Sequence, residues 1–188
     1  MEDWVYKAMS RWPDVPALYG WLSLDRRGHW RIRGEIISRP QIIDTINRNY
    51  AVDARGCWYF QNGPQRGYMQ LEYAPFVLYV HKDHLRTHTG QTLSDLLMAF
   101  LDEEGSLLLL SEYGAGLLLD QDLPWALTRL YAGEAPADEA QLLAALQRPS
   151  GAETGLELHY AQQRVPVQRL DRDAMPETLS FVREPRAS

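Results

Sequence analysis

The chain has 188 residues, a formal net charge of −6 and 45% hydrophobic residues, a composition typical of a globular protein with one sizeable domain or two small ones. The acidic balance excludes duplex nucleic acid as the main partner, because phosphate contacts require a basic face. No apolar run approaches the roughly 20 residues that a membrane-spanning helix needs, and the single cysteine, Cys57, excludes both an internal disulfide and a cysteine-rich zinc site.

The first residues, MEDWVYKAMSRW, begin acidic and lack the basic, apolar and small-residue regions of an export signal. We therefore expect a cytoplasmic protein. Within this stretch Trp4, Ala8, Met9 and Trp12 are spaced as on one face of a short amphipathic helix, which Pro13 would end.

Residues 20–80 predict several strands and one helix. The stretches WLSLD and HWRIRG predict a strand, a turn and a second strand. A helix is expected from Ser38 and Pro40 onward, because proline is tolerated in the first helical turn and Ile42, Ile43 and Ile46 form an apolar stripe. The stretch CWYFQ and residues 68–73 and 76–80 predict three further strands.

Residues 92–170 predict a second, similar set of elements. Leu93, Leu96, Leu97 and Phe100 recur at helical spacing, so we expect a helix that Thr92 caps. The stretches SLLLLSE and LLLD predict a hairpin. A short helix follows at about residues 138–146, and residues 156–170 predict one or two strands.

A short motif, Asp-x-x-Gly, occurs at residues 25–28, 53–56 and 102–105. In a type I turn the first position favours Asp, whose side chain accepts bonds from the backbone that follows, and the fourth position favours Gly. The chain has neither the P-loop nor the EF-hand spacing. We interpret the three motifs as turns that lead into strands, and we expect no cofactor at them.

Two parts of the chain share the order helix, Asp-x-x-Gly turn, hairpin and Pro-aromatic exit. We therefore predict an α+β fold of two repeated helix plus antiparallel β-hairpin units with a C-terminal α/β extension. The corresponding domains are residues 1–85 for the first unit, 86–133 for the second and 134–188 for the extension, packed on the second unit.

The stretch from residue 20 to residue 80 resembles an uncharacterised bacterial family that is known as a domain of unknown function. The resemblance rests on Gly28, Trp30 and Gly34, on Arg39 with Pro40, on Gly56 with Trp58, and on Glu72 with Ala74, Pro75 and Phe76. It implies two α+β units that share a structural motif, pleckstrin-homology-like features and a part in signal transduction. It carries over no catalytic residues.

Three histidines, His81, His84 and His88, lie close together in the sequence with Asp83 among them. Imidazoles and a carboxylate are ligands for zinc or another transition metal. They share one face only if the segment is helical, whereas Thr87 and the residues that follow favour an exposed linker. We expect no bound metal, and these three histidines are only weak candidates for metal ligands.

Aromatic and arginine residues alternate along the strands of the first half. Arginine and large aromatics dominate recognition hot spots, and aromatics also form the core of small domains. Both interpretations stay open for the whole set: Trp30, Trp58, Phe60, Tyr68, Tyr73, Arg31, Arg33, Arg55 and Arg66. The candidate binding residues are Arg55, Arg66, Tyr68 and Tyr73.

No arrangement of nucleophile and base is readable, and the acidic pairs Glu103–Glu104 and Asp120–Asp122 lie beside turns, where solvated carboxylates are usual. We expect a non-enzymatic binding or signalling adaptor module with a protein or small-ligand partner, and a homodimer stays open. The alternatives are a cofactor-free hydrolase whose site forms only in three dimensions and a structural subunit of a complex.

Overall fold

The computed structural model describes residues 15–187 and shows a mostly β fold. Of these residues, 43% lie in strands and 17% in helices, and the strands form two mixed sheets. The α+β arrangement of two repeated helix-plus-hairpin units is therefore wrong. The helix expected at residues 4–12 lies outside the described residues. In the part of the chain that is described, no helix is both long and apolar enough to cross a bilayer.

The chain forms two compact units. The first contains residues 15–75 and 180–187 among those described, and the second contains Phe76–Leu179. The second unit is thus an insertion in the sequence of the first. The division into residues 1–85, 86–133 and 134–188 stays a prediction.

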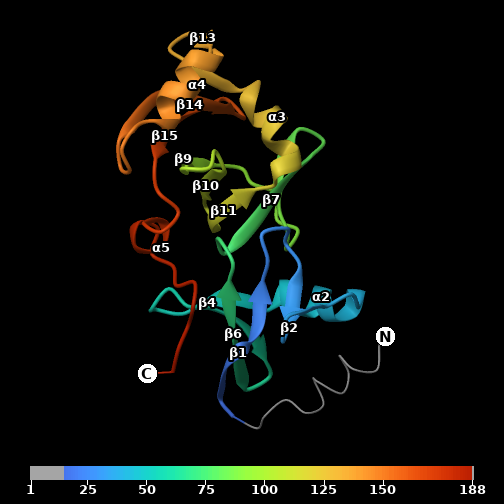
Figure 1. Ribbon diagram of the computed structural model, residues 1–188. Coiled ribbons are helices and arrows are strands. Elements are labelled where there is room, and N and C mark those ends of the chain that lie inside the picture. Colours follow the sequence, from blue (N-terminus) through green and yellow to red (C-terminus); the bar gives the residue numbers. More distant parts are fainter. Residues whose placement is uncertain (1–14, 188) are drawn as a thin grey trace. The chain divides into compact units, whose positions relative to one another are not determined.

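The first unit is a six-stranded sheet with the order β3-β2-β1-β6-β5-β4 (Figure 1). Strands β1 and β6 pair in parallel, and the other neighbours are antiparallel. Helix α2 (Pro40–Arg48) connects β3 to β4 and has Pro40 in its first turn, as predicted. The strands are β1 (Ala17–Leu24), β2 (Trp30–Ile32), β3 (Glu35–Ile36), β4 (Tyr50–Val52), β5 (Trp58–Asn62) and β6 (Gln65–Leu71).

One face of this sheet forms the core with α2. The Trp30 indole donates a hydrogen bond to Asn47 of α2 at 2.7 Å, and its ring contacts Tyr50 edge-on with centroids 4.9 Å apart. The ring centroid of Tyr50 in turn lies 4.8 Å from that of Trp58. Strand alternation places buried side chains such as Trp58 and Phe60 on this face. The side chains between them, such as Tyr59, point to the opposite face.

Residues 180–187, the return segment, complete the first unit after the chain has left it. The Val182 amide donates to the Gly56 carbonyl at 3.0 Å, and the Leu71 amide donates to the Arg183 carbonyl at 2.9 Å. Phe181 is buried. The return segment therefore lies between the start of β5 and the end of β6.

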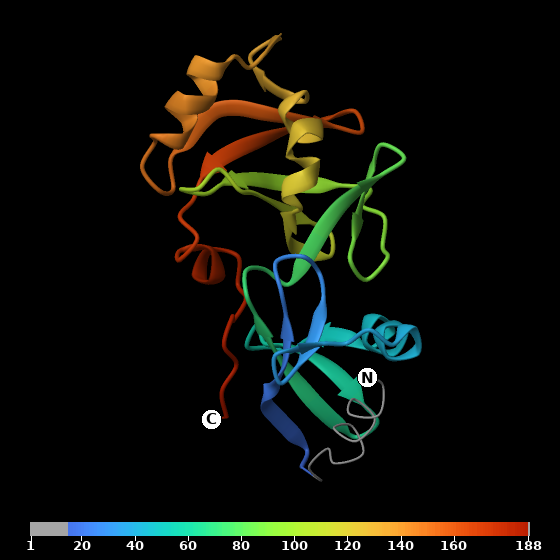
Figure 2. The same ribbon diagram turned by 45° about the vertical axis from the view of Figure 1, so that its right-hand side comes forward.

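The second unit is a nine-stranded sheet with the order β13-β12-β14-β15-β9-β10-β11-β7-β8 (Figure 2). Its parallel neighbours are β15 with β9 and β11 with β7. Helix α4 (Glu139–Leu146) begins with a capping box formed by Asp138 and Gln141, close to the predicted start. The strands are β7 (Phe76–His81), β8 (His84–Thr87), β9 (Leu96–Leu101), β10 (Leu107–Ser111), β11 (Gly114–Leu118), β12 (Leu130–Ala132), β13 (Ala135–Pro136), β14 (Glu153–Tyr160) and β15 (Gln163–Arg169). The other helical elements are η1 (Asp120–Asp122), α3 (Leu123–Leu127) and α5 (Met175–Thr178).

The helix predicted after Thr92 is wrong, because residues 96–101 form β9. This strand lies between β15 and β10, and most of its residues are buried. Its six residues are all apolar, including exposed Leu97, and in such a continuous run helical spacing occurs by chance. The Pro-aromatic exits also differ, since Phe76 begins strand β7 whereas Trp125 lies in helix α3.

The three Asp-x-x-Gly motifs adopt the same turn, as predicted. In each, one Asp carboxylate oxygen accepts hydrogen bonds from the backbone amides two and four residues later, at 2.7–3.0 Å. The glycine amide donates to the Asp carbonyl, and the glycine φ is 80–84°. The turns connect β1 to β2, β4 to β5 and β9 to β10.

Candidate binding face on the first sheet

Three tyrosines from three neighbouring strands stack on the face of the first sheet opposite α2. Tyr59 on β5 and Tyr68 on β6 are cross-strand partners, with ring centroids 5.7 Å apart. The ring of Tyr19 on β1 lies parallel to that of Tyr68, with centroids 4.6 Å apart. Two arginines, Arg55 and Arg66, cover these rings. We call the five residues the tyrosine–arginine cluster.

Arg55 is held in this cluster by a carboxylate. Its guanidinium lies 5.6 Å from the Tyr68 ring centroid and donates to Asp53 and to the Tyr19 hydroxyl, at 3.1 and 3.4 Å from Nη2. The Tyr68 hydroxyl also donates to Asp53. Burial would raise the pKa of Asp53, but hydrogen bonds from the backbone and from Arg55 outweigh it and lower the pKa. The charge of Arg55 is therefore balanced by Asp53, which lies beside the cluster.

Arg66 is placed differently. Its guanidinium lies 4.5 Å from the Tyr59 ring centroid, and the residue is exposed. Hydrogen bonding to Tyr68 and the nearby Tyr59 raise the pKa of Arg66. In the described part of the chain, no carboxylate forms an ion pair with this guanidinium. Arg66 thus presents an oriented positive charge on an aromatic surface.

The candidate Tyr73 lies outside the cluster. Only 1% of its surface is exposed, and its ring is covered by the guanidinium groups of Arg26 and Arg183, at 5.0 and 5.6 Å. The structure therefore brings together Arg55, Arg66 and Tyr68 of the candidate binding residues and places Tyr73 elsewhere. Of the wider aromatic set, Trp30, Trp58 and Phe60 belong to the core.

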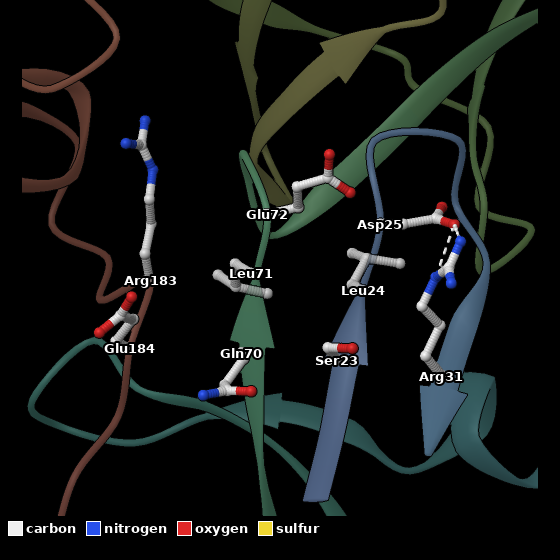
Figure 3. A pocket seen from close by; sticks show the side chains of 9 residues that line it. All are labelled: Ser23, Leu24, Asp25, Arg31, Gln70, Leu71, Glu72, Arg183 and Glu184. Atoms are coloured by element: carbon white, nitrogen blue, oxygen red, sulfur yellow. Dashed lines mark hydrogen bonds and ion pairs between the residues drawn. The ribbon is translucent and has the colours of Figure 1, made fainter. Parts of the chain in front are cut away.

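A cavity of about 310 Å³ opens where the parallel strands β1 and β6 end (Figure 3). We call it the polar pocket. Strand β1 contributes Ser23, and Gln70 of β6 is its cross-strand partner. The pocket is lined by Ser23, Leu24, Asp25, Arg31, Gln70, Leu71, Glu72, Arg183 and Glu184.

Asp25 is the most constrained group of the polar pocket. It is 7% exposed and accepts hydrogen bonds from the Arg27 and His29 amides, from the His29 ring at 3.1 Å and from Arg31 at 2.9 Å. Burial would raise the pKa of Asp25, but these hydrogen bonds outweigh it and lower the pKa below its ordinary value of 3.8. The group is therefore an ionised structural anchor, which is a poor general acid.

We expect Asp25→Asn to lower the free energy of unfolding by about 2 kcal/mol at neutral pH, because the charged hydrogen bonds to Arg31 and His29 are lost. A carboxylate whose pKa is lower in the folded than in the unfolded protein stabilises the fold. Its contribution is complete above the unfolded pKa of 3.8 and disappears as the pH falls through the folded pKa. Urea unfolding between pH 7 and pH 2 measures it, and the wild-type and variant curves should converge on acidification. Asp44→Asn, exposed on α2, is the control, and a constant gap between the Asp25→Asn and wild-type curves would contradict the assignment.

The three histidines do not converge. His81 and His84 are cross-strand partners that flank the turn between β7 and β8, where Lys82 and Asp83 have positive φ. His88 follows the far end of β8, and its Nδ1 accepts a hydrogen bond from the Val77 amide at 3.2 Å. The expected linker is therefore a hairpin. Within residues 15–187, no group of three His, Cys, Asp or Glu side chains is placed to hold a metal.

The sequence analysis missed Tyr19, Tyr59 and the polar pocket. Tyr59 alternates with buried Trp58 and Phe60, so strand periodicity could have placed it on the outer face. Tyr19 reaches the cluster through the parallel pairing of β1 with β6. That pairing has no local signal in the sequence, because the two strands are joined by a long connection.

Comparison with solved structures defines the class of fold. The chain is similar to a DUF1285 family protein from Silicibacter pomeroyi DSS-3, with a TM-score of 0.54, 13% identity and 83% of each chain covered. A DUF1285 family protein from Shewanella baltica OS155 gives a TM-score of 0.43 and 14% identity, covering 54% of this chain and 86% of that chain. At 13% identity, the similarity to the Silicibacter pomeroyi protein shows only that the two chains share a fold.

The chain itself belongs to the family DUF2944, whose model is described as "Protein of unknown function (DUF2946)" and matches residues 1–186. The expected membership of a family of unknown function is thus confirmed. The pleckstrin-homology-like features stay an implication of the resemblance. A search of curated proteins gave no match.

Proposed function

We propose that the chain is a non-enzymatic binding module of the adaptor type, and that its tyrosine–arginine cluster recognises an acidic segment of a partner protein. The observation that carries the proposal is Arg66. Its exposed guanidinium lies over Tyr59 and forms no ion pair with a carboxylate of the described residues.

Several properties of the cluster support recognition of an acidic segment. A guanidinium that rests on an aromatic ring is oriented before binding, so less side-chain entropy is lost when it meets a ligand. Its planar set of donors matches a carboxylate. Arginine and tyrosine are also among the residues that dominate binding hot spots.

The chemistry of the nearby acidic and thiol groups supports a non-enzymatic role. The pKa values of Asp25 and Asp53 are lowered by hydrogen bonds from the backbone and from arginines. Burial raises the pKa of the Cys57 thiol, which disfavours the nucleophilic thiolate. These groups serve the fold, and the cluster is left as the recognition surface.

We expect Arg66→Gln to weaken binding of a fluorescein-labelled glutamate-rich peptide by about tenfold or more, as loss of an arginine hot spot does. The free energy of unfolding should change by no more than about 0.5 kcal/mol, because the side chain is exposed. Fluorescence anisotropy measures the binding and urea unfolding measures the stability. Arg66→Lys keeps the charge without the planar fork and should give an intermediate affinity.

The matched control is Arg48→Gln, an exposed arginine on α2. It removes the same charge from the same unit but not from the cluster, so its affinity should equal that of the wild type. A lysine-rich peptide of equal length tests the sign of the charge. Equal loss of affinity in Arg48→Gln and Arg66→Gln would remove the tyrosine–arginine cluster as the binding surface.

A further inference from the structure

We propose that Arg33, stacked on Trp21, is a second contact point for the same partner, so that the first unit recognises an extended protein segment through two separate carboxylates. This inference rests on the function proposed for the tyrosine–arginine cluster and specifies the ligand of that site. It is carried by the position of the Arg33 guanidinium, by the face on which it lies and by the charge of the first unit.

Arg33 repeats the arrangement of Arg66. Its guanidinium lies 4.1 Å from the centroid of the Trp21 ring, and the residue is exposed. Within residues 15–187, no ion pair joins Arg33 to a carboxylate. Arg33 and Gly34 form the short connection between β2 and β3, and the Arg33 amide donates to the Trp21 carbonyl at 2.8 Å. The guanidinium is therefore oriented before a ligand arrives, which lowers the entropy cost of binding.

The Arg33–Trp21 pair lies on the same face of the first sheet as the tyrosine–arginine cluster. Leu22 is buried and pairs with Ile32, which shares its face of β2 with the core residue Trp30. Strand alternation therefore directs the preceding residue, Trp21, to the opposite face. The strands β2, β1 and β6 are neighbours (Figure 1), and β5 follows β6. Arg33 and Arg66 thus lie toward opposite ends of a row of aromatic side chains that crosses these strands.

The distance between the two contact points requires more than one carboxylate. Trp21 lies on β1 and Tyr59 on β5, with β6 between them. Neighbouring strands are about 4.8 Å apart, so the two backbones are separated by roughly 10 Å. In an extended segment, side chains at positions i and i+2 or i and i+4 share one face, about 7 or 13 Å apart. Two acidic side chains of such a segment can therefore contact both guanidiniums, whereas one cannot.

The charge of the first unit favours an acidic partner, although the whole chain is acidic. The described residues of the first unit contain ten arginines and six acidic residues, whereas the second unit contains seven basic and sixteen acidic residues. Charges farther apart than about 8 Å are largely screened at physiological ionic strength. The sign of the charge around this face therefore matters more to a ligand than the net charge of the chain.

The aromatic rings of this face are covered, which favours a protein segment over a single-stranded nucleic acid. Bases bind such surfaces by stacking on aromatic rings. Here Tyr19 stacks on Tyr68. The guanidiniums of Arg33 and Arg66 lie over the two other rings. The groups presented to a ligand are thus planar donor forks, which match carboxylates.

Two fluorescein-labelled peptides of equal length test the inference. One has glutamate at alternate positions, and the other has a single glutamate with glutamine at the remaining alternate positions. We expect Arg33→Gln to weaken binding of the first peptide about tenfold, the loss of an arginine hot spot. The single-glutamate peptide should lose at most about twofold, because one of two contact points remains for its one carboxylate. Fluorescence anisotropy measures both affinities, and the urea midpoint of Arg33→Gln should equal that of the wild type because the side chain is exposed.

Arg48→Gln, on α2, is the matched control and should bind both peptides as the wild type does. An oligothymidylate with as many charges as the alternating peptide should bind more weakly than that peptide. Stronger binding of the oligothymidylate would overturn the inference, as would equal losses of the two peptides in Arg33→Gln. Wild-type affinity of Arg33→Gln together with weakened binding by Arg66→Gln would remove the second contact point and leave the proposed function intact. Wild-type affinity of both variants would contradict the inference and the proposed function together.

Discussion

Gly56→Ala is expected to lower the free energy of unfolding of the first unit by about 3 kcal/mol or more. Two costs add at this position. The glycine has φ +80°, a left-handed conformation that costs other residues about 1–2 kcal/mol. A Cβ atom would also lie 2.6 Å from the Ser180 carbonyl oxygen. Relieving such an overlap by moving backbone costs about 1–3 kcal/mol.

Urea unfolding followed by tryptophan fluorescence, to which the buried Trp30 and Trp58 of the first unit contribute, measures this effect. The matched control is Gly34→Ala in the same unit, where φ is +86° but nothing lies within 4 Å of the added Cβ. It should lose only the conformational part, about 1–2 kcal/mol. If Gly56→Ala and Gly34→Ala lose the same amount, the close approach of the return segment contributes nothing to stability.

Arg169→Met is expected to destabilise the second unit by about 3 kcal/mol, although it replaces a charged residue by an apolar one of similar length. Arg169 is 5% exposed and donates to the carbonyls of Leu146 and Leu101, at 3.2 and 3.3 Å. These carbonyls belong to the last residues of α4 and β9. A buried acceptor that loses its partner costs about 1–3 kcal/mol. The Leu146 carbonyl loses the Arg169 bond, the Leu101 carbonyl keeps only the Leu170 amide at 3.0 Å, and Asp171 loses an ion pair of 2.8 Å.

The control is Arg164→Met in the neighbouring part of β15. Arg164 forms two hydrogen bonds to Glu134, at 2.7 and 3.0 Å, but half of its side chain and most of that of Glu134 are exposed. An exposed ion pair contributes about 1 kcal/mol or less. Urea unfolding of both variants should separate them clearly, and comparable losses would mean that the bonds from Arg169 to the Leu146 and Leu101 carbonyls contribute little to stability.

Features that depend on neighbouring residues could be predicted from the sequence. The Asp-x-x-Gly turns formed because their hydrogen bonds span at most four residues, and α2 began at Pro40. Residues 96–101 were misassigned because their apolar spacing also fits a helix. They form a strand by pairing with β10 and β15, and the sequence does not state which strands will be neighbours.

The candidate site shows the same limit. Arg55, Arg66 and Tyr68 were found together because they lie on or beside adjacent antiparallel strands. Tyr73 follows β6 closely, but its side chain is buried beneath Arg26. The polar pocket depends on the parallel pairing of β1 with β6 and on Arg183, which are contacts between distant parts of the chain. Sequence periodicity describes the faces of a strand and not its partners.

The return segment also determines the order in which the molecule can be finished during synthesis. Residues that pair with Gly56 and Leu71 are made only after all of the second unit. Strands β1–β6 can therefore assemble early, but the return segment takes its place beside Cys57 last. The entropy cost of loop closure grows only with the logarithm of loop length, so the inserted second unit adds little to the free-energy cost of docking the return segment. The wall of the polar pocket that contains Arg183 and Glu184 is consequently absent from the nascent first unit and present in the finished one.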